Sequence, residues 1–422
     1  MKVLVVGSGG REHALVWKLS QSPKVEKMYC APGNAGIAQM AECVNIKAED
    51  LDGLLAFAQE QRIDLTVVGP EVPLTMGIVD KFNEKGLKIF GPSGKAAEIE
   101  GSKTFAKDLM AKYNIPTAKY GAFTDADQAK AFLAEVGLPC VVKADGLAAG
   151  KGVLICETKE EAEAAVADIL VDNKFGDAGS RVVVEEFLTG QEVSMLAFTD
   201  GNTVVPMVSS QDHKRIWDGD KGLNTGGMGA YSPAPIYTPD VHAIVVPEVL
   251  EATVAAMKAE GRPFAGILYA GLMLTADGPK VLEFNARFGD PETQAVLPRL
   301  KSDLVDIFLA IIDGKLHEMQ IEWYEEAAVC VVMASGGYPE TSDKGRVITG
   351  LDKAAETGAI VFHAGTKETD GNIVTNGGRV LGISALGKDI AEAIANAYKG
   401  VEQIQFENMQ YRTDIGKKAF LA

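Results

Sequence analysis

Short apolar runs alternate with amphipathic segments over the first hundred residues. Strands are predicted at 2–6, 27–30, 64–69 and 87–91, and helices at 13–20 and 52–61. Strands that alternate with helices form a parallel sheet with crossover helices. Such open sheets bind ligands beyond the carboxyl ends of their strands. We therefore expect a βαβ domain with a ligand crevice at that edge. Glu71 follows the third strand and is a candidate for this crevice. The alternative is that Glu71 is only a polar loop residue.

The middle of the chain predicts helices at 103–113 and 126–136, followed by LPCVVKADGLAAGKGVLIC at 138–156. The two ends of this stretch predict strands, and the glycine-rich segment between them has too few side chains to pack. We predict a flexible flap over a ligand. An amphipathic helix is expected in TKEEAEAAVADIL, directly after the flap.

The rest of the chain predicts a strand pair over 181–201, a long glycine-rich loop over 219–233 and a helix over 246–258. Two further apolar runs lie within 266–292. From about Glu326 the alternation starts again and ends in a helical segment at 388–400. This restart indicates a separate C-terminal domain.

Length and charge narrow the function classes. A chain of 422 residues is too long for one core, so two to four domains are expected. The formal net charge of −17 opposes binding to nucleic acid and to anionic membranes. No apolar segment would span a bilayer, the apolar start is too short for a signal peptide, and five scattered cysteines are typical of reduced core thiols. We expect a cytoplasmic monomer whose partners are small molecules, with no nucleic acid and no membrane.

The first predicted strand runs into the glycine turn GSGG, directly before a helix. Free backbone N–H groups at a helix start suit a phosphate. A dinucleotide-binding turn needs a glycine at its sixth position, where this chain has Glu12, a residue expected to hinder helix–strand packing. Gly9, Gly10 and Arg11 therefore suit a single anionic group such as a sugar phosphate, and an ordinary tight turn is an equal alternative.

VLEFNARFGD at 281–290 carries a metal signal. On a strand, Glu283, Asn285 and Arg287 share one face, and Leu282, Phe284 and Ala286 share the other and can form core. A carboxylate and an amide oxygen two residues apart suit magnesium, and Arg287 can hold an anion without losing its charge. The alternative is the polar face of a half-solvated strand.

Three lysines lie beside glycine-rich stretches. Lys103 begins a helix, Lys143 closes a strand, and Lys151 lies in the flap between Gly150 and Gly152. Each alone is most often a solvated surface charge, but together with an acidic metal pair they suit a polyphosphate. The flap does not match the Walker A motif, and the kinase motifs are missing.

VVVEEFLTGQE at 182–192 is the third candidate element. The end of its strand offers a backbone edge to an adenine at Glu185, Glu186, Phe187 and Leu188. Glu192 can accept hydrogen bonds from ribose hydroxyls. The alternative is a surface strand with acidic residues.

Taken together, these residues resemble a known family, the phosphoribosylamine–glycine ligases (glycinamide ribonucleotide synthetases) of the ATP-grasp superfamily. The similarity covers the whole chain and lies in GSGGREHAL, GPEVPL, KADGLAAGKGV, EEFLTGQEVS, QDHKR, GLNTGGMGAYSP, LYAGLML and NARFGDPETQ. It implies an α/β and α+β multidomain fold. The expected parts are a Rossmann-like parallel-sheet substrate domain at 1–102, a two-part ATP-grasp domain at 103–325 with a mobile flap subdomain at about 117–190, and a small C-terminal α+β domain at 326–422.

The resemblance also implies an activity, the ATP-dependent ligation of glycine to 5-phosphoribosylamine in purine biosynthesis. ATP and Mg²⁺ or Mn²⁺ are the implied cofactors, with the metal on Glu283 and Asn285. The ATP phosphates are assigned to the lysines and the flap, the adenine to Glu186–Leu188 and the ribose to Glu192. The implied catalytic residues are Arg287, Lys143 and Lys151.

The same resemblance places the other substrates. The opening turn and Glu71 are assigned to phosphoribosylamine. Glycine and its acyl phosphate are assigned to Asp212, His213, Lys214, Arg287 and Asp290. Formation of glycyl phosphate would make the carboxylate reactive, and lysines, metal and arginine would neutralise the moving charge. A flap that excludes water would protect the acyl phosphate.

Three other functions remain open at this level. The first is an ATP-grasp ligase or carboxylase for another acid or amine, the second a nicotinamide-dependent oxidoreductase, and the third a nucleotide-binding regulator without catalysis. Glu12 disfavours the second, and the intact metal pair disfavours the third. Replacement of Glu283 by alanine is expected to abolish turnover, and replacement of Arg11 by alanine is expected to weaken the sugar-phosphate substrate more than ATP.

Overall fold

The apolar runs at the start of the chain form a five-stranded sheet in the order β3-β2-β1-β4-β5, in which every neighbouring pair is parallel. The computed structural model describes residues 1–147, 152–172 and 174–421. Residues 3–6 of β1 are fully buried, as expected for a parallel sheet covered on both faces. The elements are β1 (Lys2–Gly7), α1 (Gly10–Leu19), β2 (Lys27–Pro32), β3 (Glu42–Cys43), α2 (Leu51–Gln61), β4 (Leu65–Val68), α3 (Glu71–Thr75), α4 (Ile78–Asn83), β5 (Ile89–Phe90) and α5 (Gly94–Gly101). The predicted Rossmann-like parallel sheet is confirmed.

The next segment folds into a small antiparallel sheet in the order β6-β9-β7-β8. The helices α7 and α8 pack against it through an apolar cluster of their own. The elements are α6 (Lys103–Lys112), β6 (Tyr120–Phe123), α7 (Ala126–Val136), β7 (Cys140–Ala144), β8 (Val153–Cys156), α8 (Lys159–Leu170) and β9 (Val182–Glu186). The strands on either side of the predicted flap are present, and the flap residues 148–151 lie outside the described part of the chain.

A second antiparallel sheet, in the order β11-β10-β16-β17, forms the middle of the molecule. The predicted strand pair over 181–201 is wrong in one respect. Both strands form, but β9 joins the small sheet and β10 pairs with β16 across its whole length. The elements are β10 (Gln191–Asp200), β11 (Val204–Pro206), α9 (Pro239–Val245), a π-helical stretch (Val246–Glu251), α10 (Ala252–Ala259), β16 (Ala265–Thr275), β17 (Gly278–Asn285), α11 (Glu292–Val296) and α12 (Leu304–Ile312).

The C-terminal sheet has the order β12-β15-β18-β22-β19, so two of its strands come from the middle of the chain. The expected long loop over 219–233 is therefore wrong, because it contains β15 and half of the hairpin β13–β14. The elements are β12 (Gln211–Asp212), β13 (Arg215–Trp217), β14 (Lys221–Asn224), β15 (Gly229–Ser232), β18 (Ala327–Ala334), α13 (Leu351–Glu356), β19 (Ile360–His363), β20 (Thr366–Thr369), β21 (Asn372–Thr375), β22 (Arg379–Gly387) and α14 (Ile390–Val401).

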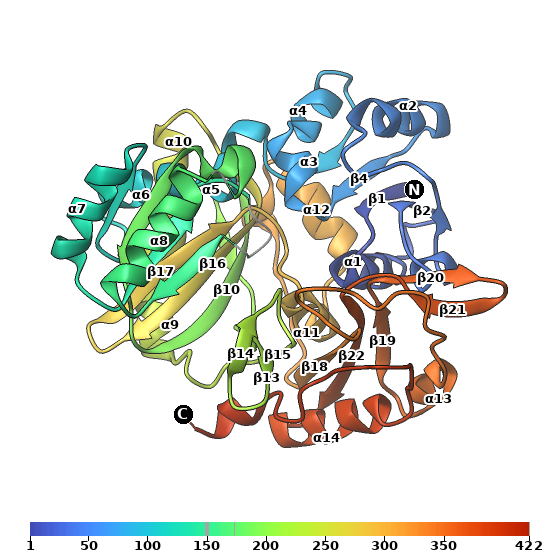
Figure 1. The fold of residues 1–422 in the computed structure, drawn as a ribbon. Helices are drawn as coiled ribbons and strands as arrows, with labels where there is room; N and C mark the ends of the chain where they lie inside the picture. The colour runs from blue at the N-terminus through green and yellow to red at the C-terminus, as the bar shows by residue number, and fades with distance from the viewer. Residues whose placement is uncertain (148–151, 173, 422) are drawn as a thin grey trace.

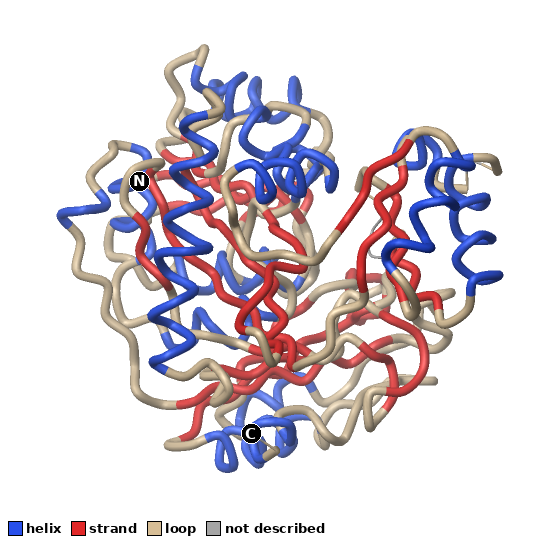
Figure 2. The backbone as a smooth tube through the Cα atoms, turned by 90° about the vertical axis from the view of Figure 1, so that its left-hand side faces the viewer, coloured by secondary structure: helices blue, strands red, loops and turns tan. Residues whose placement is uncertain are grey.

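These parts of the molecule are not arranged in a row. The small sheet with α7 and α8 lies on one side of the central sheet, and the N-terminal and C-terminal regions lie on the other (Figure 1). Helices lie toward the outside and strands run through the middle (Figure 2). No helix in the described ranges combines the length and apolarity needed to cross a bilayer.

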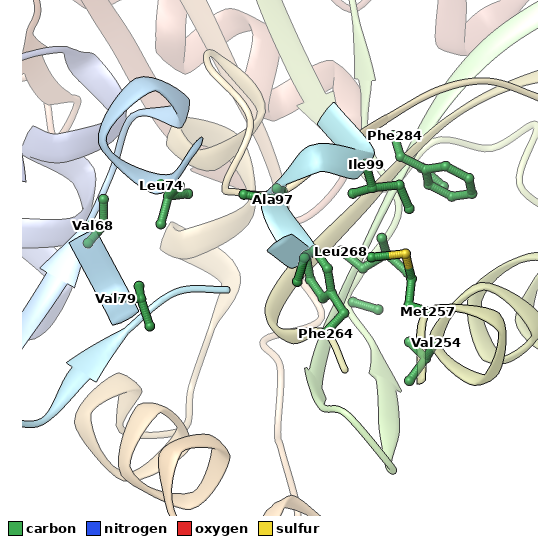
Figure 3. Close-up of a cluster of buried hydrophobic side chains, with 14 of the residues drawn as sticks. Val68, Leu74, Val79, Ala97, Ile99, Val254, Met257, Phe264, Leu268 and Phe284 are labelled. Atoms are coloured by element: carbon green, nitrogen blue, oxygen red, sulfur yellow. The ribbon is translucent and has the colours of Figure 1, made fainter. Parts of the chain in front are cut away.

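The largest apolar cluster joins the N-terminal sheet to the central sheet. Figure 3 shows α5 between the two, with Ala97 and Ile99 between Leu74 on one side and Phe284 on the other. Because β17 ends beside this core, the residues that follow it are held against the edge of the N-terminal sheet. Four cysteines are buried, as expected for core thiols, but Cys43 is exposed.

Candidate active site

A cavity of about 470 Å³ opens where the N-terminal, central and C-terminal regions meet. It brings together most of the residues singled out in the sequence. Those on its wall are Arg11, Glu71, Lys103, Lys143, Gly152, Glu185, Asp212, Lys214, Glu283, Asn285, Arg287 and Asp290. They come from segments as distant in the sequence as α1 and the end of β17, so they lie close together only in the folded protein.

A buried carboxylate holds two of the lysines at the cavity wall. Glu185 on β9 lies 2.9 Å from Lys143 Nζ and 2.8 Å from Lys107 Nζ, and all three side chains are buried. Burial raises the pKa of Glu185, but the two ammonium groups outweigh it and hold that pKa below its usual range. Burial lowers the pKa of Lys107 to about 8. Two cations on one anion leave a net positive charge, which suits a phosphate group.

This arrangement gives the Glu185 side chain a role and adds Lys107 to the site. The side chain binds lysines, and the backbone contact of Glu185 with an adenine stays a prediction. Lys107 lies one helical turn after Lys103 on α6, and this i, i+4 spacing was the signal in the sequence for a second lysine on the same face. Lys103 itself donates to Gly146 O at 2.9 Å, and burial lowers its pKa.

Glu283 and Asn285 face the cavity at the end of β17, as the strand alternation predicts. Burial raises the pKa of Glu283, but Lys214, Lys143 and Lys103 outweigh burial and hold that pKa below its usual range. No basic group among the described residues lies within 4 Å of this carboxylate, and Asn285 Oδ1 accepts only a 3.3 Å hydrogen bond from Arg287. A free carboxylate beside an amide oxygen fits a divalent cation.

The sequence placed Leu282 on the core side of β17, and the structure corrects this. The pairing with β16 passes from Gly271–Glu283 to Leu272–Val281, which leaves Leu282 as an extra residue. Such a bulge redirects side chains. Leu282 therefore lines the cavity, where it packs with Leu188, Ala118 and Met273.

Arg287 connects the end of β17 to the N-terminal region. Its guanidinium lies 2.8 Å from Glu100 and 3.2 Å from Glu71. Glu100 also accepts a 2.7 Å hydrogen bond from the amide of Ala286, and burial raises its pKa. Glu100 was not predicted from the sequence, because an acidic residue on an amphipathic helix gives no signal of burial.

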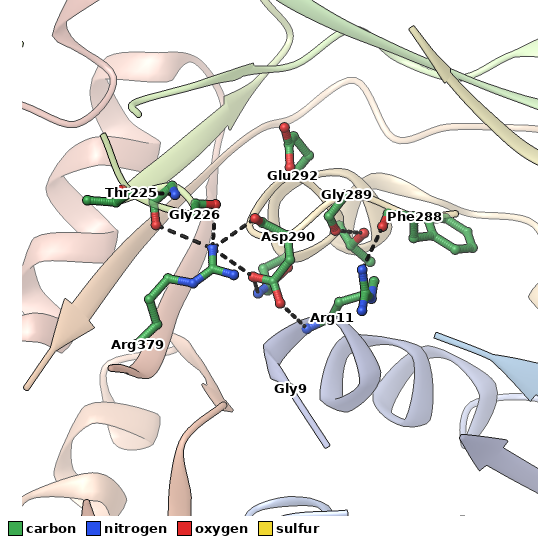
Figure 4. Close-up of polar contacts among 12 residues, drawn as sticks. Gly9, Arg11, Thr225, Gly226, Phe288, Gly289, Asp290, Glu292 and Arg379 are labelled. Atoms are coloured by element: carbon green, nitrogen blue, oxygen red, sulfur yellow. Dashed lines mark hydrogen bonds and ion pairs between the residues drawn. The ribbon is translucent and has the colours of Figure 1, made fainter. Parts of the chain in front are cut away.

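The glycine turn after β1 holds a side chain of the protein itself. Figure 4 shows this region beside α1. The Glu12 carboxylate accepts a 2.6 Å hydrogen bond from the amide of Gly9 and one of the same length from Arg11 Nε. A Cβ at Gly7 would lie 2.5 Å from Glu12, and one at Gly69 would lie 2.0 Å from it. The glycines therefore make room for Glu12, which corrects the expectation that this residue would hinder packing.

The Arg11 guanidinium is already bonded to groups of the protein itself. Besides Glu12, its guanidinium donates to Phe288 O at 3.2 Å and lies 4.0 Å from Glu71. Its amide donates to the Asp290 carboxylate at 3.1 Å. Its side chain lies on the cavity wall, so a contact between Arg11 and an anionic substrate stays a prediction.

Gly9 and Gly10 line a second cavity of about 280 Å³ between the N-terminal and C-terminal regions. Asp290 and Arg379 line both cavities. Arg379 at the start of β22 donates to Gly226 O at 2.7 Å and to Asp290 O at 2.8 Å, and it forms an ion pair with the Asp290 carboxylate at 3.3 Å (Figure 4). Arg379 was missed because its segment matches no motif.

Of the remaining residues predicted from the sequence, some face the cavity and others do not. Asp212 and Lys214 flank His213 on and after β12, and they face the cavity. His213 is fully buried and stacks obliquely on Tyr231, so its expected place beside the substrates is wrong. This follows from strand alternation, which turns its side chain to the other face.

Four candidates lie beside the cavity without lining its wall. They are Glu186, Phe187, Leu188 and Glu192. Glu186 accepts a hydrogen bond from the amide of Lys119, and Glu192 pairs with Lys214 at 2.6 Å. Gly150 and Lys151 lie outside the described residues.

A buried pair of histidines joins α1 to β19 and predicts a pH effect on stability. His13 Nδ1 accepts a 2.7 Å hydrogen bond from the amide of His363, so this nitrogen carries no proton. Burial lowers the pKa of His13 to about 3 and that of His363 to about 4. The unfolded chain takes up protons near pH 6.5 and the folded chain does not, so stability falls as pH drops from 6.5 toward 4.

The expected loss is about 1.4 kcal/mol per histidine for each pH unit below 6.5. Urea unfolding at pH 7, 6 and 5 measures it. His13→Asn keeps an acceptor that does not titrate, so it should reduce the slope by one histidine's share. An unchanged slope would mean that His13 is charged in the folded state.

Comparisons with known proteins agree along the whole chain. Residues 1–100, 101–293 and 328–418 match the N, ATP-grasp (A) and C domains of phosphoribosylglycinamide synthetase. The chain is 56% identical over 422 residues to phosphoribosylamine–glycine ligase of Vibrio vulnificus, covering 99% of this chain and 98% of that protein. It is 57% identical over 423 residues to the protein of the same name from Xanthomonas campestris pv. campestris, with the same coverage.

Solved structures agree with this match. A crystal structure of phosphoribosylamine–glycine ligase from Thermotoga maritima aligns with a TM-score of 0.86 and 33% identity, covering 98% of this chain and 100% of that one. The biotin carboxylase domain of the Hydrogenobacter thermophilus 2-oxoglutarate carboxylase aligns with a TM-score of 0.73 and 16% identity, covering 97% and 91%. The second likeness concerns the fold alone.

Proposed function

Since the chain belongs to the phosphoribosylglycinamide synthetase family, we propose that it ligates glycine to 5-phosphoribosylamine with ATP, giving glycinamide ribonucleotide, ADP and phosphate. It is an ATP-grasp ligase of purine biosynthesis that uses ATP and a divalent metal ion. The observation that carries the proposal is that three groups line the same cavity. They are the lysine pair on Glu185, the oxygen pair Glu283–Asn285 and Arg287.

The positive end of this cavity is assigned to the ATP phosphates. Lys103, Lys107 and Lys143 supply the charge, and Leu282, which packs against Leu188, offers an apolar surface to the adenine. Glu186–Leu188 and Glu192 remain the proposed adenine and ribose contacts. Glu283 and Asn285 would hold Mg²⁺ or Mn²⁺, which neutralises phosphate charge when bound. The flap, with Gly150, Lys151 and Gly152, would cover the phosphates.

The reaction needs a carboxylate to approach a triphosphate, and the two repel each other. Arg287 and the lysines offset this repulsion, and they stabilise the charge that moves to the leaving oxygen. The glycyl phosphate formed is then attacked by the amine, and phosphate leaves. None of the five cysteines lines the cavity, so this chemistry proceeds without a thiol nucleophile.

Phosphoribosylamine is assigned to the second cavity and its border with the first. Gly9, Gly10, Asp290 and Arg379 lie there, and Glu71 lies close by on the main wall. The amine would then reach the acyl phosphate near Arg287. We further propose that the protein acts as a cytoplasmic monomer with domains at 1–102, 103–325 and 326–422.

Release of ADP tests the function. The protein is incubated with ATP, Mg²⁺, glycine and fresh phosphoribosylamine, and each component is left out in turn. ADP should form only with the complete mixture, and mass spectrometry should detect glycinamide ribonucleotide. ADP formation with a different acid in place of glycine would contradict the named reaction and retain the ligase class. The absence of ADP from a protein that binds ATP would instead favour a regulator.

A further inference from the structure

The hairpin β13–β14 carries part of the cavity wall at its base. Lys214 comes directly before β13 and Thr225 directly after β14, and both line the main cavity. The amide of Thr225 donates to Lys214 O at 2.8 Å, so these two residues close the base of the hairpin. The placement of the hairpin therefore decides where the Lys214 ammonium group and Thr225 lie on the wall.

The hairpin has little support of its own. Its two strands form a separate two-stranded sheet, and such a hairpin alone is only marginally stable in water. The Arg215 guanidinium donates to Gly222 O at 2.7 Å, which lies within the same hairpin. His213, beside the base, is fully buried, yet neither of its ring nitrogens has a hydrogen-bond partner among the described residues. The hairpin is therefore held in place by contacts with other parts of the chain.

Arg412, near the C-terminal end of the chain, makes such contacts and is 1% exposed. Its guanidinium donates to Arg215 O at 3.1 Å, to the Asp220 carboxylate at 2.9 Å and to the Asp414 carboxylate at 2.7 Å. Arg215 directly follows Lys214, and Asp220 lies in the turn of the hairpin. One buried side chain thus joins the base of the hairpin, its turn and the C-terminal segment.

Other contacts of the C-terminal segment reach only the turn of the hairpin. Figure 1 shows the C-terminal end of the chain beside β13 and β14. Lys418 pairs with Asp220 at 2.7 Å, and the amide of Thr413 donates to the Asp218 carboxylate at 2.8 Å. These contacts hold the turn, whereas Arg412 also bonds the base beside the cavity wall.

The shape of the guanidinium suits this position. It is planar and offers five N–H donors in fixed directions. Nε and one Nη each lie 2.7 Å from the Asp414 carboxylate, and the other Nη reaches both Asp220 and Arg215 O. Burial raises the pKa of Asp414, but the guanidinium outweighs burial and holds that pKa below its usual range. Arg412→Lys would keep a cation between the carboxylates, but one nitrogen cannot replace three that point to separate acceptors.

We propose that Arg412 is a positioning residue that holds the base of the hairpin through Arg215 O, so that Lys214 and Thr225 keep their places on the cavity wall. The kinetic consequence of this inference rests on the proposed function. Without Arg412 the base can shift, and a displacement of about 1 Å of a group that faces substrate can lower the rate about 100-fold. The alternative is that Arg412 only stabilises the fold.

The kcat of two Arg412 variants in the ADP-release assay tests the inference. Arg412→Met should lower kcat at least about tenfold, because the base loses its bond to Arg412. The KM for ATP should stay within about threefold of wild type, since the lysines proposed for the phosphates lie on other elements. Arg412→Lys should regain most of the thermal stability lost in Arg412→Met, because it keeps the charge, but its kcat should stay low.

Lys418→Met is the matched control. It removes a cation from Asp220 at the turn and leaves the bond between Arg412 and Arg215 O intact. Its kcat should stay within about twofold of wild type, as for loss of a partly exposed ion pair. All rates are measured at a temperature where every variant is folded.

Hydrogen exchange followed by mass spectrometry supplies a second readout that does not need turnover. In Arg412→Met, the amides of residues 213–228 should exchange faster than in wild type, while those of β1 and β18 keep their wild-type rates. In Lys418→Met, faster exchange should be confined to the turn. If Arg412→Met does not fold, the kcat and the exchange of Arg412→Lys decide the question.

The possible outcomes separate the two proposals. A wild-type protein that releases no ADP contradicts the proposed function. In a working protein, a kcat within about twofold of wild type in the Arg412 variants overturns the positioning role. Recovery of stability and kcat together in Arg412→Lys overturns it as well, since Arg412 would then act through stability alone. Unchanged exchange over residues 213–228 would show that Arg412 does not hold the hairpin.

Discussion

Glu283→Ala is expected to lower turnover at least about 1,000-fold, because the metal loses its only carboxylate among the proposed ligands and several kcal/mol of charge stabilisation go with it. The carboxylate has no basic group within 4 Å among the described residues, so its loss leaves no buried cation newly unpaired. Stability should change by no more than about 1 kcal/mol. Turnover is followed by ADP release, and stability by urea unfolding.

Two controls make this result specific to the metal. Asp277→Ala removes an exposed acid at the turn of the same β16–β17 hairpin and should leave turnover unchanged. Asn285→Ala should reduce turnover and raise the concentration of Mg²⁺ or Mn²⁺ needed for half-maximal rate. Turnover close to wild type in Glu283→Ala would remove the metal assignment.

Arg287→Met is expected to lose both activity and stability. The kcat should fall by about 100- to 1,000-fold, since a cation is removed from the place where charge develops. The Glu100 side chain is 6% exposed and would lose its ion pair, which should cost about 3–5 kcal/mol of unfolding free energy. Single-turnover kinetics measures the first effect, and urea unfolding the second.

A second substitution separates these two roles. Glu100→Gln removes the unpaired charge, so the double variant Arg287→Met/Glu100→Gln should regain most of the lost stability. Its turnover should stay low, because the cation is still missing. Recovery of both would mean that Arg287 has only a structural role.

Local patterns were sufficient for most elements and placed several of the residues that now line the main cavity, though not Lys107. Strand and helix periods depend on near neighbours, so α7 was predicted at its observed bounds and β7 and β8 close to theirs. The face shared by Glu283 and Asn285 follows from strand alternation alone. The resemblance in motifs extended this to the family, because the proposed binding groups lie in those motifs.

Other features depend on contacts between distant segments. A run of apolar residues predicts a strand but not the strand with which it pairs. The strands β9 and β10 were expected as a pair, but they belong to different sheets. The sequence also did not predict which charged groups pair with each other. Glu12 fills the glycine turn and Glu185 binds two lysines because burial makes an unpaired charge costly, and each takes the nearest opposite charge that folding supplies.

The sequence by itself determined the order of most helices and strands, the family and the residue types proposed to meet phosphate and metal. Only the tertiary structure decided which charges are already neutralised. Pairing joins Arg11 to Glu12. The physical reason is that charge pairing depends on three-dimensional distance: Arg287 and Glu71 are 216 positions apart in the sequence, and no local period encodes their approach.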